Sequence, residues 1–285
     1  MRILITGADG MLGTDLREAL GTEHDLVPTD LIGGLRFLDV TDTDQVLSTI
    51  AEVKPDAVIH AAAYTDVDGC ERDPDKAFRV NGLGTWNVAT ACARIGATLV
   101  YISTDFVFDG EKGEPYTEYD AVNPLGHYGA SKLAGETHVR TVCRKHFIVR
   151  TAWLYGVHGK SFPRAMIDLA RTREEISVVA DQVGSPTFTV DLARAIGLLL
   201  DNPLCGTYHV TNKGSCSWYE FAARTLALAG INNIKVKPIK AAEWPSPTRR
   251  PKYSVLRHCA LEFQGRDNMR PWEDALADFV SRLDL

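Results

Sequence analysis

The sequence lacks a hydrophobic run of the length that a membrane span requires, which is about 20 residues. It also lacks an excess of positive charge. The net charge is −6, with both signs mixed along the chain, so no nucleic-acid surface is expected and a phosphate ligand would need local donors. Met1 to Gly7 already has the pattern of a strand entering a turn, which argues against a cleaved signal peptide. We therefore expect a protein that binds neither a membrane nor a nucleic acid.

Cysteine is sparse and has no regular spacing. The six cysteines are widely scattered without metal-ligand spacing, and the eight histidines form no paired motif. We expect reduced, mostly structural thiols in a cytoplasmic protein, and no bound metal. The cysteines are Cys70, Cys92, Cys143, Cys205, Cys216 and Cys259.

The first half of the chain alternates strand-like and helix-like segments. Short apolar runs predict strands at Arg2–Ile5, Leu26–Thr29, Ala57–Ala62, Thr98–Ser103 and Phe147–Arg150. Helices are predicted between them, at Met11–Leu20, Thr43–Glu52, Asp75–Arg94 and Tyr128–Cys143. This order is typical of the α/β class, and it predicts a Rossmann-type, doubly wound parallel sheet covered on both faces.

The pattern loosens after about Tyr155, which predicts a second, smaller lobe. We place a dinucleotide-binding Rossmann domain at residues 1–155 and a mainly substrate-binding lobe at 156–285. Within the second part, residues 188–205 are expected to pack back on the first domain. Four of the thirteen prolines fall between Pro238 and Pro251, which indicates an ordered surface loop or lobe edge.

A glycine-rich loop follows the first predicted strand and opens the first helix. Its sequence is Gly7-Ala8-Asp9-Gly10-Met11-Leu12-Gly13. The first glycine permits a sharp turn, the second lets the backbone approach a pyrophosphate, and the third allows close packing of helix and strand. The helix N-terminus adds free N–H groups and a favourable dipole. The loop predicts a dinucleotide site, although a plain tight turn would need some of the same residues.

Asp30 ends the second predicted strand, 20 residues after Gly10. A carboxylate there can accept hydrogen bonds from the adenosine ribose, and it would repel the additional phosphate of NADP. However, Gly33, Gly34 and the cationic Arg36 lie just beyond it and can accommodate that phosphate. The cofactor is therefore expected to be NADPH or NADH, with the preference open.

Tyr128 and Lys132 lie one turn apart at the start of a predicted helix. A phenol has a pKa of about 10 in water, and a nearby ammonium lowers it, which would make Tyr128 a usable general acid. Thr104, just past a predicted strand, can offer its hydroxyl to the same substrate oxygen. Although a Tyr-x-x-x-Lys pair alone is common on surface helices, the glycine loop upstream favours a catalytic set of Thr104, Tyr128 and Lys132.

These residues resemble those of the extended short-chain dehydrogenase/reductase superfamily, and the resemblance covers nearly the whole chain. It implies that Asp39 and Val40 flank the adenine, that Ala61, Ala62 and Ala63 line the cofactor, and that Asn81 supports the cofactor and active-site architecture. It further implies that Lys132 holds the nicotinamide ribose beside Tyr128. From the residues alone, His60 and the three alanines after it indicate ordinary core packing.

Within that superfamily the chain resembles the dTDP-4-dehydrorhamnose reductase family. The matching blocks are 63–68, 103–110, 150–156, 181–187 and 250–256. The resemblance implies reduction of the C4 carbonyl of a dTDP-linked 4-keto-6-deoxysugar, with Val67, Phe106 and Trp153 contacting the sugar or its nucleotide beside Thr104 and Tyr128. Apolar and aromatic surfaces suit a methyl-bearing sugar ring and a pyrimidine.

Three alternatives stay open from the sequence. The first is another sugar-nucleotide enzyme, either a C4 epimerase or a reductase of a different 4-keto-6-deoxysugar. A dehydratase is disfavoured, because Thr104 is followed by Asp105 and Phe106 rather than by two carboxylates. The second is a non-catalytic role like that of the regulatory subunit of methionine adenosyltransferase. The third concerns assembly: a homodimer is possible, and Asp15 and Asp191 lie near where some relatives carry an interface metal.

Overall fold

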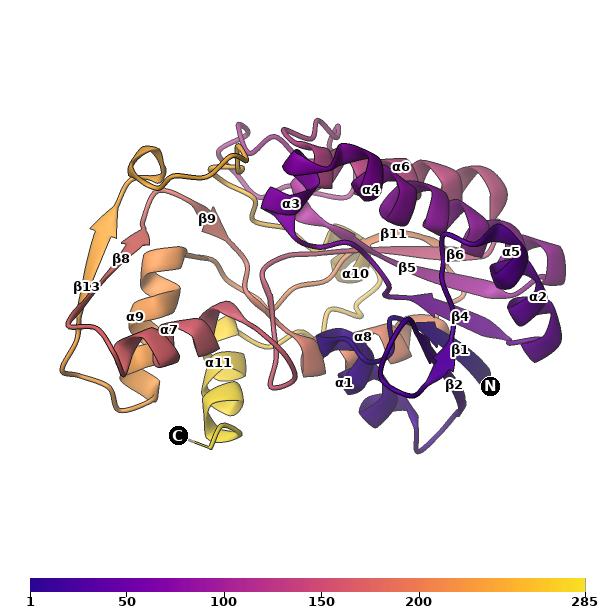
Figure 1. Cartoon of the computed structure of the whole chain (residues 1–285), viewed down its shortest axis with the longest axis horizontal. Coiled ribbons are helices and arrows are strands. Elements are labelled where there is room, and N and C mark those ends of the chain that lie inside the picture. Colours follow the sequence, from indigo (N-terminus) through magenta and orange to yellow (C-terminus); the bar gives the residue numbers. More distant parts are fainter. Residues whose placement is uncertain (285) are drawn as a thin grey trace.

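Seven parallel strands form the central sheet of the computed structural model, which describes residues 1–284 (Figure 1). From one edge to the other the strands are β11 (Gly206–His209), β6 (His146–Thr151), β5 (Thr98–Thr104), β4 (Ala57–His60), β1 (Arg2–Thr6), β2 (Asp25–Asp30) and β3 (Arg36–Phe37). The predicted Rossmann-type parallel sheet is thereby confirmed. The strand order reverses between β1 and β4, and such a switch point opens a ligand crevice at the carboxyl ends of the strands.

The strands are apolar on both sides because helices cover both faces of the sheet. In β1, Ile3 and Ile5 pack into the core on one face, while Leu4 between them packs into the core on the other. Helices α1 (Met11–Leu20) and α8 (Thr189–Leu200) cover the first face, and α2 (Thr43–Val53), α5 (Thr85–Ile95) and α6 (His127–Val142) cover the second (Figure 1). The sheet is thus doubly wound.

The second half of the chain returns to the sheet before completing a smaller lobe. Helix α8 packs on α1 through Leu192 and Ile196, and β11 then pairs with β6 at the sheet edge. Short α10 (Cys259–Phe263) contributes Leu261 to the same core. Chain segments far apart in sequence therefore build one face of the nucleotide-binding domain.

The smaller lobe combines three two-stranded pairs with three helices around an aromatic core. The pairs are β7 (Leu154–Tyr155) with β10 (Thr187–Phe188), β9 (Val183–Gly184) with β12 (Cys216–Ser217), and β8 (Glu175–Val179) with β13 (Lys235–Ile239). The helices are α7 (Phe162–Ala170), α9 (Trp218–Leu228) and α11 (Trp272–Ser281). Tyr155, Phe188, Phe221 and Phe279 meet in the core with edge-to-face and stacked geometries.

Further short elements connect the strands and helices described above. They are α3 (Val67–Arg72), α4 (Pro74–Ala77), the π-helix η1 (Phe78–Gly84), and the 3₁₀ turns η2 (Asp105–Val107) and η3 (Ala241–Glu243). All six cysteines are free thiols, and only Cys205 is exposed. Within residues 1–284, every helix is too short or too polar to cross a bilayer.

A buried ion pair fixes α6 to the sheet. The Arg150 side chain on β6 donates two hydrogen bonds to the Glu136 carboxylate, at 2.9 and 2.8 Å, and both side chains are almost fully buried. Ser103 donates to the same carboxylate at 2.6 Å, and the partly exposed Arg140 adds a further bond. Because Glu136 and Arg150 are both desolvated, loss of Arg150 leaves the buried carboxylate with only the partly solvated Arg140 as a cationic partner.

Replacing Arg150 with Met should therefore lower the free energy of unfolding by about 3–5 kcal/mol, as measured by urea denaturation. Arg140→Met is the matched control and should cost about 1 kcal/mol or less, because that guanidinium is partly solvated. The double variant Glu136→Leu, Arg150→Met should recover most of the loss. Equal costs for the two arginine variants would show that the buried pair does not hold α6.

Candidate active site

A pocket of about 700 Å³ lies at the carboxyl ends of the central strands. It is lined from both halves of the chain, and it gathers almost every residue that the sequence predicted for the site. These are Gly7, Gly10, Met11, Leu12, Gly13, Asp30, Asp39, Val40, Ala61, Ala62, Ala63, Val67, Thr104, Phe106, Tyr128, Lys132 and Trp153.

The glycine loop forms one end of this pocket. Gly7 has a φ of 68°, and a Cβ there would lie 2.7 Å from the backbone nitrogen of Ala62, so no larger residue fits between β1 and β4. Gly10 is the N-cap of α1 and provides no side-chain cap. The first N–H groups of α1 thus remain available to an anion in the pocket, as a pyrophosphate requires.

Asp30 is held at the pocket wall by backbone groups. Its carboxylate accepts from the N–H of Asp9 at 2.9 Å and from that of Leu31 at 2.7 Å, which orients it beside the loop. Arg36, which the sequence offered as a partner for an additional phosphate, instead pairs with Glu52 at 2.7 Å on the surface. A 2′-phosphate would have to draw Arg36 away from that carboxylate.

Thr104 and Tyr128 meet where the end of β5 faces the first turn of α6. The Thr104 hydroxyl donates to Asp105 Oδ1 at 3.1 Å and accepts from the Phe106 N–H at 3.2 Å. The Phe106 ring packs edge-to-face on Tyr128, with centroids 5.5 Å apart. Gly129 makes this approach possible, because a Cβ at that position would lie 2.1 Å from the Phe106 carbonyl oxygen.

The pKa shifts of Tyr128 and Lys132 are dominated by burial. Burial raises the pKa of Tyr128 above its ordinary value, the Thr104 hydroxyl opposes the rise, and the Asp105 charge adds to it. Burial lowers the pKa of Lys132 to about 7, with Glu136 acting in the opposite direction. The Lys132 ammonium lies 4.2 Å from the centre of the Tyr101 ring.

The expectation that Lys132 lowers the pKa of Tyr128 is therefore not met in this structure. The pKa of the phenol shifts in the opposite direction, because desolvation raises it, the charges of Asp105 and Cys70 add to the rise, and only the Thr104 hydroxyl opposes it. A phenol with a raised pKa stays protonated at neutral pH. Such a group is a proton donor rather than a base.

Asn81 is the one predicted site residue that does not line the pocket within residues 1–284. It lies buried in η1, where its amide accepts from the Tyr64 N–H at 2.8 Å and donates to the Tyr64 carbonyl and Ser131 Oγ, both at 3.0 Å. Asn81 therefore links the backbone of Tyr64 to Ser131 of α6, outside the pocket lining. Its π-helical setting is a common local distortion near functional sites.

The histidine that ends β4 is structural. His60 is buried between the hydroxyls of Thr6, at 2.7 Å, and Thr85, at 3.2 Å. Burial lowers its pKa to about 3, with Lys132 adding to the shift, so the ring is neutral. The predicted core-packing role agrees with the surroundings of His60, whereas Ala61, Ala62 and Ala63 line the pocket.

The other end of the pocket is aromatic and includes a residue that sequence reasoning missed. Trp153 has a φ of 48°, a strained value for a tryptophan, and its ring stacks on Trp218 with centroids 3.5 Å apart. Both line the pocket. Trp218 begins α9, and no local pattern marks it, because its role arises only from packing between distant segments.

Two lining residues carry buried polar atoms without a hydrogen-bond partner among the residues that the structure describes. They are Asp105 Oδ2 and Thr151 Oγ1. Burial raises the pKa of Asp105 to about 6, although the neighbouring hydroxyls of Ser254 and Thr104 oppose the rise. Such unsatisfied groups are costly and are expected where a polar ligand completes the bonding. They fit a pocket that receives a hydroxylated ligand next to a dinucleotide.

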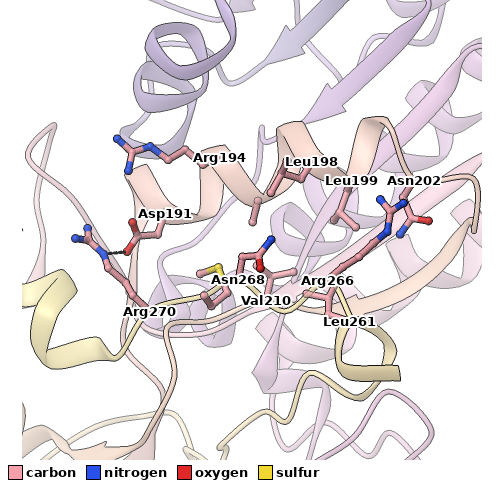
Figure 2. A pocket seen from close by; sticks show the side chains of 12 residues that line it. Asp191, Arg194, Leu198, Leu199, Asn202, Val210, Leu261, Arg266, Asn268 and Arg270 are labelled. Atoms are coloured by element: carbon pink, nitrogen blue, oxygen red, sulfur yellow. Dashed lines mark hydrogen bonds and ion pairs between the residues drawn. The ribbon is translucent and has the colours of Figure 1, made fainter. Parts of the chain in front are cut away.

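A second, smaller pocket of about 280 Å³ lies between α8 and the 266–270 segment (Figure 2). Asp191 there is engaged by Arg270 at 2.8 Å and by Asn212 at 2.7 Å. This pocket contains none of the predicted catalytic or cofactor residues, so the larger pocket is the candidate active site.

Asp15 and Asp191, the acidic residues considered for an interface metal, have different neighbours. Asp191 is committed to the contacts just described, whereas Asp15 faces Glu18 and His158, with His158 Nε2 3.7 Å from its Oδ1. Burial raises the pKa of Asp15. The two carboxylates thus do not share one ligand set.

The sequence matches a known protein family over its whole length. The model of the RmlD substrate binding domain matches residues 1–285. A dTDP-4-dehydrorhamnose reductase of Streptomyces griseus is 41% identical over 97% of this chain and 92% of its own length.

Solved structures agree over the full length. A dTDP-4-dehydrorhamnose reductase from Clostridium acetobutylicum has 46% identity and a TM-score of 0.96, covering 100% of both chains. One from Bacillus anthracis, in complex with NADP, has 46% identity and a TM-score of 0.95 over 99% of both chains.

The buried ammonium of Lys132 should make the stability of the cofactor-free protein depend on pH. Its folded pKa of about 7 lies below the unfolded value, so the unfolded chain binds the additional proton between the two. The buried ammonium therefore lowers the free energy of unfolding by its full amount below pH 7 and has no effect above about pH 10.4. Lys132→Met should therefore raise the free energy of unfolding by about 2–4 kcal/mol at pH 7 and by less than about 1 kcal/mol at pH 10.

Denaturant titrations at both pH values measure this difference, with Lys145→Met as the control. Lys145 is an exposed lysine that donates to the Gly96 carbonyl, and its replacement should have the same small effect at both pH values. An equal effect of Lys132→Met at pH 7 and pH 10 would contradict the buried-ammonium account.

Proposed function

The chain belongs to the RmlD substrate binding domain family, and we propose that it reduces the C4 carbonyl of dTDP-4-dehydro-L-rhamnose to form dTDP-L-rhamnose, using NADPH or NADH. The observation that carries this proposal is the convergence of Thr104, Tyr128 and Lys132 with the glycine loop in one pocket. A proton donor and a dinucleotide site side by side are what a carbonyl reduction needs.

The residues of this pocket suit the dinucleotide. The loop and the N-terminus of α1 would hold its pyrophosphate, Asp30 its adenosine ribose, and Asp39 and Val40 its adenine. Ala61 to Ala63 leave room for it along the end of β4. When bound, the reduced nicotinamide supplies the hydride that the C4 carbon accepts.

The protein's own contribution is to the carbonyl oxygen. The Tyr128 phenol, kept protonated by its raised pKa, donates its proton to the oxygen as negative charge develops there. The Thr104 hydroxyl turns from Asp105 toward the same oxygen and adds a second hydrogen bond. Lys132, one turn along α6, would hold the nicotinamide ribose next to Tyr128.

The aromatic end of the pocket would receive the rest of the substrate. Phe106, Trp153 and Val67 offer apolar surface to the deoxysugar ring and the base, and Trp218 backs Trp153. The predicted division of labour, in which residues 1–155 with 188–205 bind the dinucleotide and the remainder of 156–285 mainly binds the sugar nucleotide, stays a prediction, because only Trp218 of these four residues belongs to the second part. Asp105 stands alone beside Thr104, without the second carboxylate that elimination of water would require.

The direct test mixes the purified protein with dTDP-4-dehydrorhamnose and either NADPH or NADH, and follows the absorbance of the reduced nicotinamide. One equivalent of oxidised nicotinamide per dTDP-rhamnose formed would support the reductase and rank the two cofactors. Conversion without net oxidation would indicate an epimerase. No conversion by a protein that binds the cofactor would indicate another keto-sugar or a regulatory role.

Tyr128→Phe should lower kcat by about 10²- to 10⁴-fold, because the substitution removes the proton donor and little volume. The dissociation constant for NADPH or NADH, measured by fluorescence titration, should change less than threefold. Tyr119→Phe serves as the control, since that tyrosine is exposed at the surface and lies outside the pocket lining. Full activity in Tyr128→Phe would remove Tyr128 from the mechanism.

A further inference from the structure

The lining of the active-site pocket includes three cationic side chains, Lys132, Lys160 and Arg250. Lys132 belongs to the catalytic pair. Lys160 follows Gly159, which lies next to Met11 of the glycine loop, so it belongs to the dinucleotide end. Arg250 has no place in the catalytic set, and the sequence block that contains it assigned it no role.

Arg250 reaches the pocket on a loop strap, defined here as residues 246–250, which is fastened to the start of α3. Asp68 is the fastening point. Its Oδ1 accepts from Thr248 Oγ1 at 2.8 Å, from Ser246 Oγ at 3.1 Å and from the Arg250 guanidinium at 3.4 Å. Three side chains of the strap therefore converge on one carboxylate oxygen about 180 positions earlier in the chain.

The fastening places Arg250 beside Val67, at the substrate end of the pocket. Asp68 directly follows Val67, which lines the pocket, and the Thr248 hydroxyl also lies 3.4 Å from the Val67 carbonyl oxygen. About one third of the Arg250 side chain stays exposed. Within residues 1–284, Asp68 is the only carboxylate that the Arg250 guanidinium contacts. Most of the guanidinium N–H donors therefore remain free for a ligand.

The negative charge of the proposed ligands gives the Arg250 donors a role. The proposed reaction brings two diphosphates into one crevice, one from the dinucleotide and one from the sugar nucleotide. The N-terminus of α1 and its glycine loop can satisfy the first. The second would lie at the end of the pocket that holds Val67, where the Arg250 guanidinium is a fork of donors suited to phosphate oxygens.

We infer that Arg250 binds the diphosphate of the sugar-nucleotide substrate, and that Asp68 is a positioning residue that holds the strap and the guanidinium in place. This inference rests on the proposed function for its substrate class, a nucleoside diphosphate sugar. Burial would raise the pKa of Asp68, but hydrogen bonds from Thr248 and Ser246 and the charge of Arg250 keep it below its usual value. The Asp68 carboxylate is therefore charged at neutral pH.

Binding of dTDP and of thymidine, measured by calorimetry on the full-length protein, tests the inference without requiring turnover. Arg250→Gln should weaken dTDP binding by about 10- to 100-fold, the effect of losing charge-assisted hydrogen bonds. Thymidine, which has no phosphate, should bind within twofold of its affinity for the unmodified protein. Arg250→Lys should recover part of the dTDP affinity, because it keeps the charge without the fork.

Arg249→Gln is the matched control. Arg249 precedes Arg250 on the same strap, but it pairs with the exposed Glu111 at 3.2 Å and lies outside the pocket lining. Its replacement should leave both affinities unchanged. Asp68→Asn should weaken dTDP binding less than Arg250→Gln does, and it should add nothing in the Arg250→Gln background if Asp68 acts through Arg250.

Unchanged dTDP binding in folded Arg250→Gln would overturn the inference, as would an equal loss for thymidine and dTDP. Absence of dTDP binding by the unmodified protein would overturn it as well. The reductase assay tests the proposed function separately. If the protein binds dTDP through Arg250 but does not reduce dTDP-4-dehydrorhamnose, the role of Arg250 stands and the proposed sugar substrate is wrong.

Discussion

The close approach of α6 to the end of β5 is the contact on which the active site depends. It brings Tyr128 to Thr104, and it is possible because Gly129 presents no side chain to the Phe106 carbonyl. Two turns along α6, Glu136 ties the helix to β5 and β6 through Ser103 and Arg150. Catalytic geometry and core stability are therefore properties of one interface.

Burial at this interface determines the chemistry that the site can perform. Desolvation raises the pKa of the Tyr128 phenol and lowers that of the Lys132 ammonium to about 7. The phenol holds its proton at neutral pH and can act as the donor in a carbonyl reduction. The same desolvation makes Lys132 a cost to the fold, which is common where function sets the environment of a side chain.

Sequence reasoning succeeded where local spacing determines geometry. The glycine loop, Asp30 at a strand end, and the Tyr128–Lys132 pair one turn apart all follow from periodicity, and the pocket gathers them. It could not find Trp218 or Arg250, because each reaches the pocket through contacts with segments far away in the chain. Asn81 lies outside the pocket lining, where its amide bonds Tyr64 and Ser131, and its contact with a cofactor stays a prediction. The pKa of Tyr128 shifts in the direction opposite to the one predicted, because desolvation depends on tertiary burial.

The central claim is that hydride passes to C4 of a dTDP-linked keto-sugar in this pocket while Tyr128 protonates the oxygen. Reduced nicotinamide carrying deuterium at the transferable position tests it most directly, with the product analysed by NMR. The account predicts one deuterium per molecule at C4 of dTDP-rhamnose and none elsewhere in the sugar. A product without deuterium at C4, or with deuterium drawn from solvent at a neighbouring carbon, would contradict it.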